Sequence, residues 1–196
     1  MKNIDSVQLI ELSKQIHGYQ LRKGFWDVER SIDHHMMMII TEISEAVEAD
    51  RRDKRAQMDE YNYWKPVLIR QAQFRDFPDL YRKDIKNTIE EEFSDIAIRS
   101  IGIAIHLGMD YYDFEIMDTP AAMPEHDFTN HTFSENAITI IRFITNHECS
   151  HMAAALTVLH NIFQWAASMD IDLISHIKLK LEYLNFNLPS FTVKKY

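Results

Sequence analysis

Glycine and proline are scarce in this chain, whose 196 residues include four glycines and five prolines. These residue types most often interrupt helices and form tight turns, so their scarcity leaves long uninterrupted segments. The composition argues against a turn-rich β fold and predicts an all-α protein. Hydrophobic residues make up 46% of the chain, which is enough for one core, and we expect a single domain over residues 1–196.

Cysteine and long apolar runs are also lacking. Cys149 is the single cysteine, so no intramolecular disulfide can form, and we expect a reducing compartment such as the cytoplasm. No apolar run approaches the roughly 20 residues that a membrane-spanning helix needs. The first residues, MKNIDSVQLIELSKQ, lack the sustained apolar segment of a secretory signal.

Basic residues are outnumbered, with 21 Lys and Arg against 30 Asp and Glu and a formal net charge of −9. Such a chain repels the phosphates of nucleic acids and anionic lipids, so we expect neither nucleic acid nor a membrane as a partner. Nucleotides remain open to an acidic protein, because divalent cations can neutralise their phosphates.

Two acidic pairs share the same helical spacing. Glu42 and Glu45 lie in a segment that predicts a helix, and Glu92 and Asp95 lie in a later one. Residues three apart lie on one helical face, so two such helices packed together would gather four carboxylates around a hard cation. Glu91 projects about 100° away and is a supporting candidate. The alternative is a solvated surface, which the three consecutive glutamates at 90–92 would also fit.

The apolar pattern predicts a bundle of about five to seven helices around a four-helix core. We expect Phe77-Pro78-Asp79 to break the chain, and residues 110–134 to be irregular, as a lid, an interface arm or a linker. A weak internal similarity indicates a duplication whose degenerate second half has Met152 and Ala155 in place of the acids. The first expected helix begins near residue 6 and ends between residues 18 and 24, and a long helix runs from residue 80 or 84 to 107. The other expected helices run approximately over residues 33–51, 64–74, 135–147, 151–169 and 172–185.

The connector Lys23-Gly24-Phe25-Trp26-Asp27 carries two aromatic residues and a cation. In one interpretation Phe25 and Trp26 form a hydrophobic plug over the bundle. In the other, Trp26 stacks on a nucleotide base and Lys23 lies near a phosphate. The sequence leaves both open.

Residues His147-Glu148-Cys149-Ser150-His151 match H-E-x-x-H, in which two histidines one helical turn apart bind zinc and the glutamate acts as base. A zinc site needs a further ligand. His160 falls on the opposite face of the same expected helix, and His176 and Glu182 follow no recognised spacing. No upstream segment alternates as the strand that presents a peptide substrate should. A zinc metallopeptidase is therefore kept as an alternative.

Four segments together resemble the MazG-like, all-α nucleoside triphosphate pyrophosphohydrolase superfamily, which includes the dimeric dUTPases. Residues 46–91 separate the acidic pairs by more than in compact members, so we expect an inserted helix or loop there. The segments that carry the resemblance are KGFWD at 23–27, SEAVEADR at 44–51, IKNTIEEEFSDIAIRSIGIAIHLGMD at 85–110 and HIKLKLEY at 176–183.

The resemblance implies Mg²⁺-dependent hydrolysis of a nucleoside triphosphate to a monophosphate and pyrophosphate, with Mn²⁺ as a substitute metal and removal of non-standard nucleotides as a candidate role. Glu45 and Glu92 would be the catalytic carboxylates. The implied metal ligands are Glu42, Glu45, Glu92 and Asp95. The substrate-binding candidates are Lys23, Trp26, Arg99 and Lys180.

A site built on two helices is poorly enclosed by one bundle, so we also expect a homodimer or homotetramer with the site near the interface. A third interpretation is a non-catalytic helical interaction protein derived from the same fold. Turnover of nucleotides separates it from the enzyme.

Overall fold

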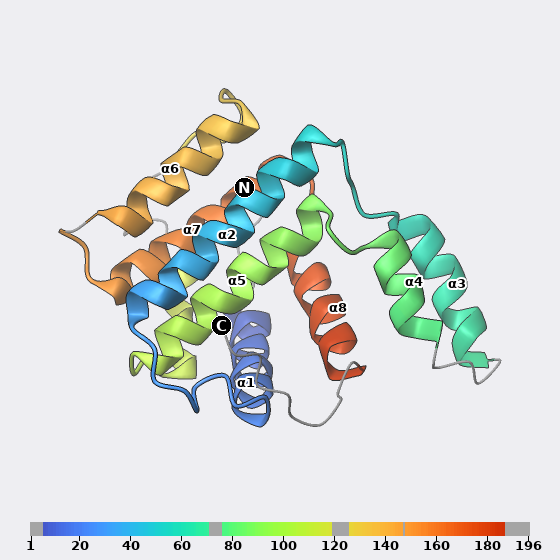
Figure 1. Cartoon of the computed structure of the whole chain (residues 1–196), viewed down its shortest axis with the longest axis horizontal. Coiled ribbons are helices and arrows are strands. Elements are labelled where there is room, and N and C mark those ends of the chain that lie inside the picture. Colours follow the sequence, from blue (N-terminus) through green and yellow to red (C-terminus); the bar gives the residue numbers. More distant parts are fainter. Residues whose placement is uncertain (1–5, 71–75, 119–125, 147, 187–196) are drawn as a thin grey trace.

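The computed structural model describes residues 6–70, 76–118, 126–146 and 148–186. Within these ranges the chain forms eight α-helices and one 3-10 helix and has no strand (Figure 1), which confirms the all-α prediction. None of these helices combines the length and the apolar content that crossing a bilayer requires. The elements are α1 (Ser6–Arg22), α2 (Ile32–Arg51), α3 (Met58–Arg70), α4 (Phe77–Asp84), α5 (Ile89–His106), η2 (Tyr111–Asp118), α6 (Phe133–Thr145), α7 (His151–Ser168) and α8 (Leu173–Phe186).

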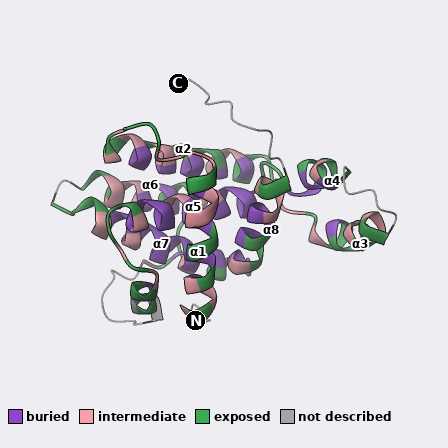
Figure 2. Cartoon of the chain, turned by 90° about the horizontal axis from the view of Figure 1, so that it is seen from below, coloured by how far each residue is buried: buried purple, intermediate pink, exposed green. Residues whose placement is uncertain are grey.

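Helix α5 lies at the centre of the molecule. It packs against α1, α2, α7 and α8, while α6 contacts both α2 and α7. Helices α2, α5, α7 and α6 run alongside one another as a four-helix core, with α1 and α8 on a further side (Figure 1). Phe93, Ile96 and Ile101 of α5 are completely buried, and buried residues follow α5 and α7 through the bundle (Figure 2). The polar groups in the buried part of α5 therefore face other parts of the protein.

The pairing of α6 with α7 beside α2 and α5 has the arrangement that an internal duplication would produce. Met152 and Ala155, aligned with the acids of α5, lie on α7, and Ala155 is completely buried. Helices α6 and α7 therefore support α2 and α5 by apolar packing. The duplication itself stays a prediction.

The long helix expected up to residue 107 is two helices, which accounts for the eighth helix. Helix α4 begins at Phe77 with Pro78 in its first turn, a position that proline tolerates because its missing N–H would be unpaired there. The chain then turns at Asn87, whose φ of 58° is left-handed. The Thr88 hydroxyl accepts a hydrogen bond from the Glu91 N–H at 3.3 Å and caps α5. The expected break at Phe77-Pro78-Asp79 corresponds to the start of α4 at Phe77, after α3 has ended at Arg70, and a second, unexpected break lies at residues 85–88.

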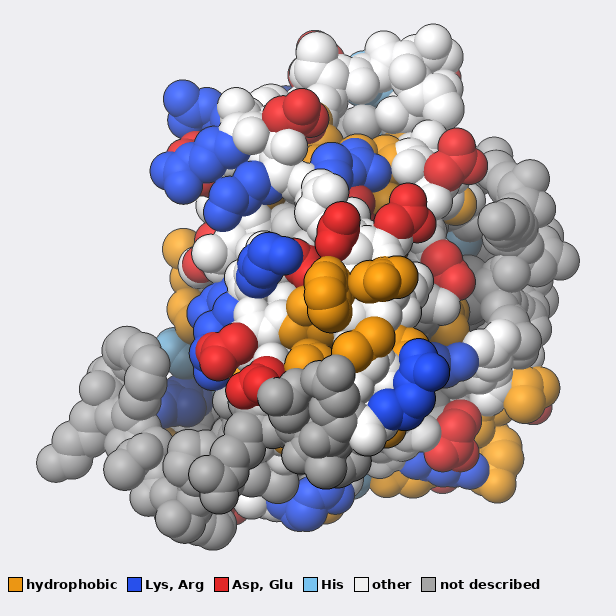
Figure 3. All heavy atoms as spheres, turned by 90° about the vertical axis from the view of Figure 1, so that its right-hand side faces the viewer, with side chains coloured by type: hydrophobic (Ala, Val, Ile, Leu, Met, Phe, Trp, Pro, Cys, Tyr) orange, Lys and Arg blue, Asp and Glu red, His pale blue; other side chains and the backbone are white. Residues whose placement is uncertain are grey.

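Helices α3 and α4 form a hairpin between α2 and α5 in the sequence, at the position where the resemblance implies an inserted helix or loop. The hairpin lies at one end of the molecule beside α8 (Figure 1). It has its own apolar cluster, which includes Tyr61, Phe77 and Leu179 of α8, and the Tyr81 ring stacks on Tyr183 at 4.0 Å. Seen from this end, hydrophobic side chains gather between acidic and basic ones (Figure 3).

Candidate metal centre

Three carboxylates converge where α2 crosses α5. Glu42 of α2 and Glu92 and Asp95 of α5 each offer one oxygen, and these oxygens lie within 4.8 Å of one another. Helix α2 reaches this point uninterrupted from its N-cap, where the Ser31 side chain accepts from the His34 N–H. Within the described ranges this is the one group of three metal-binding side chains with so close an approach. Helices α2 and α5 therefore bring acids from both predicted pairs together.

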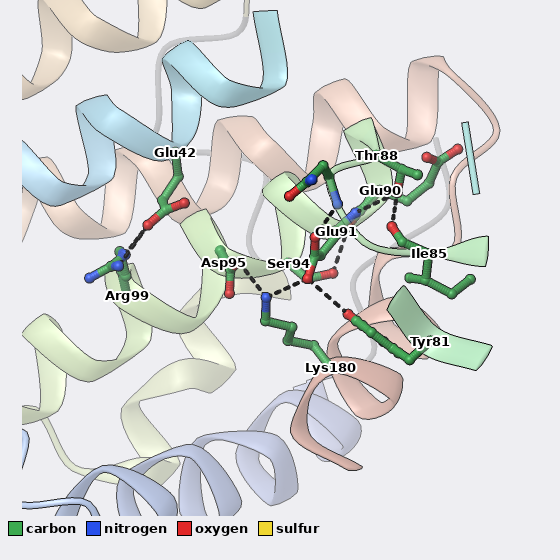
Figure 4. Close-up of polar contacts among 11 residues, drawn as sticks. Glu42, Tyr81, Ile85, Thr88, Glu90, Glu91, Ser94, Asp95, Arg99 and Lys180 are labelled. Carbon is green, nitrogen blue, oxygen red and sulfur yellow. Dashed lines mark hydrogen bonds and ion pairs between the residues drawn. The ribbon is translucent and has the colours of Figure 1, made fainter. Parts of the chain in front are cut away.

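The consecutive glutamates at 90–92 are all buried and are not a solvated surface. Because α5 is surrounded by other helices, each of the three directions meets protein. Glu90 accepts from the Arg55 Nε at 2.8 Å and from the Ala56 N–H at 3.0 Å. Glu91 accepts from Lys180 at 2.7 Å and from the Tyr81 hydroxyl at 3.3 Å (Figure 4). Two of the three thus have donors.

Glu92 is the exception. Its side chain is 3% exposed, and no hydrogen bond or ion pair joins its carboxylate to another residue in the described part of the chain. Burial raises the pKa of Glu92 from 4.5 to about 9, and the charges of Asp95, Glu91 and Glu45 add to the shift. A buried carboxylate without a donor is unfavourable when ionised, and a bound cation is the usual compensation.

Asp95 lies between the carboxylate cluster and Lys180 of α8. The Lys180 Nζ donates to Asp95 Oδ2 at 2.6 Å. Burial raises the pKa of Asp95 from 3.8 to about 6, although the lysine opposes this shift. Burial would lower the pKa of Lys180, but Asp95 and Glu91 outweigh that effect and raise it. Lys180 is therefore a fixed cation beside the carboxylate group, and the phosphate contact that the resemblance implies for it stays a prediction.

Arg99 of α5 forms an ion pair with Glu42, the third acid of the group. Its guanidinium lies 2.6 Å from Glu42 Oε1, and its side chain is 27% exposed. The bond fixes one carboxylate oxygen of Glu42 and leaves part of the guanidinium toward solvent. This position is compatible with the predicted phosphate contact.

Glu45 lies one turn after Glu42 on α2 but is exposed, and it stands outside the group within 4.8 Å. It is nevertheless close enough for its charge to raise the pKa of Glu92. The structure therefore gathers three of the four predicted ligands and places the fourth at the solvent side.

Trp26 packs as the hydrophobic-plug interpretation expects. Its ring is half-buried against the core and stacks on His106 at 4.0 Å with an interplanar angle of 7°. The indole N–H donates to the Gln20 side chain at 3.2 Å. Gln20 in turn lies over Gly102, where a Cβ would clash with it. One face of Trp26 is thus already covered by a protein ring.

Lys23 is connected to the surroundings of the carboxylate site through Tyr19. The Lys23 Nζ is 5.9 Å from the centre of the Tyr19 ring. Burial raises the pKa of Tyr19, and the charges of Lys180 and Asp95 also act on it. Tyr19 was not predicted as a site residue. Its sequence position carries no signal, because its proximity to Asp95 depends on how α1 crosses α5.

The H-E-x-x-H motif does not lie on one helix in the described residues. Glu148 and Cys149 are in a turn, Ser150 is the N-cap of α7, and His151 is the first residue of that helix. His151 is exposed, and its Nε2 lies 2.8 Å from Asp33 Oδ1. His147 lies outside the described residues. The turn removes the one-turn helical spacing on which the zinc interpretation depended.

The other proposed zinc ligands are paired with another residue or buried within helices. Glu182 pairs with Lys65 at 2.5 Å, and His176 is buried on α8. His160 is buried in α7. Among described residues, none of these histidines joins a metal-binding group.

No family model, curated protein or solved structure matches this chain. The resemblance to the MazG-like superfamily therefore rests on the sequence segments that carry it, and the geometry of the site has to support a function on its own.

Proposed function

We propose that this protein is a Mg²⁺-dependent nucleoside triphosphate pyrophosphohydrolase, which releases a nucleoside monophosphate and pyrophosphate. The observation that carries the proposal is Glu92, a buried carboxylate without a donor inside a group of three acids. Such a group is stable when a cation is bound between the acids, and carboxylate oxygens are ligands that Mg²⁺ prefers.

Glu42, Glu92 and Asp95 fit a small divalent cation in donor type and spacing. Glu45 adds a fourth carboxylate from the solvent side. When bound there, Mg²⁺ would neutralise triphosphate charge and polarise a water molecule. Mn²⁺ accepts the same oxygen ligands and is the expected substitute.

The neighbouring side chains divide into those that hold the acids and those that face the substrate. Arg99 orients Glu42 and, being partly exposed, can also meet a phosphate. Lys23 lies on the same side as Tyr19 and is the second phosphate candidate. Glu45, which is exposed, would accept a proton from the attacking water. Water oxygen then bonds to phosphorus as the bond to the pyrophosphate oxygen breaks.

Pyrophosphate release from a panel of standard and non-standard nucleoside triphosphates tests the proposal, with Mg²⁺ or Mn²⁺ supplied. We expect turnover that disappears without metal and falls at least a hundredfold in Glu45→Ala and Asp95→Ala. Absence of turnover across the panel would favour the non-catalytic interaction protein. Unchanged turnover in both variants would place the active site elsewhere.

We further propose that the enzyme acts in the cytoplasm as a homodimer or homotetramer, because two helices enclose a triphosphate poorly. Light scattering on the purified protein measures the mass directly. A mass equal to the 23.2 kDa of one chain would contradict self-association without touching the metal site.

A further inference from the structure

Lys180 of α8 is buried between two carboxylates of α5. Its Nζ lies 2.7 Å from Glu91 Oε1 and 2.6 Å from Asp95 Oδ2 (Figure 4). The lysine side chain is 10% exposed, and those of Glu91 and Asp95 are 3% and 21% exposed. A lysine this deeply enclosed is rare unless it is paired, and here it has two partners.

Both carboxylate oxygens of Glu91 already accept hydrogen bonds. Its Oε1 accepts from Lys180 and from the Tyr81 hydroxyl, and its Oε2 accepts from the Asn87 N–H. The donors come from α8, from α4 and from the linker that precedes α5. Glu91 is accordingly absent from the group of metal-binding acids, although it is one residue from Glu92.

Asp95 belongs both to the group of metal-binding acids and to the ion pairs of Lys180. Its carboxylate is part of the group with Glu42 and Glu92, and its Oδ2 accepts from Lys180. In sites with two metal ions, the ions lie about 4 Å apart and share such a carboxylate. The Lys180 ammonium contacts both Glu91 Oε1 and Asp95 Oδ2, so it holds the position where a second ion would bind these two oxygens.

We propose that Lys180 is a built-in cation that replaces a second metal ion, so that the protein without nucleotide holds one divalent cation. The proposal rests on the metal site proposed above. Lys180 is in this account a positioning residue, which fixes Asp95 through charge. Removing that charge while keeping the fold leaves Glu91 and Asp95 facing each other, and a second divalent cation then binds between them.

Mn²⁺ titration followed by electron paramagnetic resonance counts bound ions per chain and tests the proposal. We expect one ion in the wild type and two in Lys180→Gln, which keeps an amide donor but loses the charge. Lys178→Gln is the matched control on α8, because Lys178 is exposed and bonds Gln8 away from the acids. The control should bind one ion.

Two ions in the wild type, or one ion in Lys180→Gln, would overturn the proposal and leave the proposed function intact. No ion in the wild type would overturn the metal site itself. Circular dichroism shows whether the variant is folded, and Lys180→Met is the second variant if the glutamine does not fold. Should both unfold, the wild-type count still decides between one ion and two. A merely structural lysine would not change the count.

Discussion

Glu90, Glu91 and Glu92 are adjacent in the sequence but lie in three different environments. Glu90 is held by Arg55, and Glu91 by Lys180 and Tyr81. Glu92 has only other acids near it, and its pKa is raised to about 9. A group whose pKa is raised in the folded state is ionised at the expense of stability. The metal-free protein therefore loses stability as the pH rises from 4.5 towards 9.

Glu92→Gln should remove this loss. At pH 8 and without metal, we expect the variant to unfold at a higher temperature than the wild type, because an amide needs no counter-charge. With Mg²⁺, the wild type should gain stability and the variant should not. Differential scanning calorimetry with and without a chelator measures both. Glu60→Gln on α3, which is exposed, is the control and should follow the wild type; a variant less stable than the wild type would contradict this account.

Metal binding should also depend on pH through Glu92. The cation binds the ionised carboxylate, so each ion bound below pH 9 displaces close to one proton from Glu92. The apparent affinity for Mg²⁺ should rise about tenfold per pH unit in that range. Isothermal titration calorimetry from pH 6.5 to 8.5 in buffers of different ionisation enthalpy reports the protons released. An affinity independent of pH would mean that Glu92 is already ionised in the metal-free protein.

At the scale of elements, the break between α4 and α5 sets the position of the site. Residues 85–88 contain neither glycine nor proline, the residue types that usually mark the end of a helix. The sequence therefore predicts one long helix across this break. Thr88 followed three residues later by Glu91 is the pattern that begins a helix with a capping box, and it was the signal available. The break turns the Glu91 carboxylate back towards the Asn87 N–H and fixes it beside Lys180.

Thr88→Ala should cost about 1 kcal/mol of the free energy of unfolding, because the N-terminal N–H groups of α5 lose an acceptor. Thr139→Ala on α6 is the control, since Thr139 bonds only a carbonyl within its own helix. Alanine should be neutral there. Urea denaturation followed by circular dichroism gives both values, and equal losses in the two variants would show that the cap does not stabilise α5.

The sequence was sufficient for features that depend on local spacing. The helical class and the placement of Glu92 and Asp95 on one face of α5 both follow from periodicity. That α2 brings Glu42 to this face was a hypothesis from the paired acids, because it depends on how the two helices cross. The partners of Lys180 and the environment of Trp26 could not be predicted, because they join α8 to α5 and the 23–27 connector to the end of α5. Such contacts depend on how helices cross, and a single sequence does not specify helix crossings.

At the scale of the whole molecule, α5 connects every part of the site. Helix α2 supplies Glu42 on one side of α5, α8 supplies Lys180 on another, and the α3–α4 hairpin supplies Tyr81 at one end. A cation between α2 and α5 would therefore brace the centre of the fold. At a concentration 100 times its dissociation constant, it would add about 2.7 kcal/mol to the free energy of unfolding.

Separation of the reaction products tests the central claim most directly. The wild type with Mg²⁺ and the preferred nucleotide of the panel should yield equal amounts of nucleoside monophosphate and pyrophosphate by ion-exchange chromatography. Glu92→Gln should yield neither above background, and Glu60→Gln should match the wild type. A nucleoside diphosphate with inorganic phosphate, or full turnover in Glu92→Gln, would contradict a pyrophosphohydrolase that works through this carboxylate group.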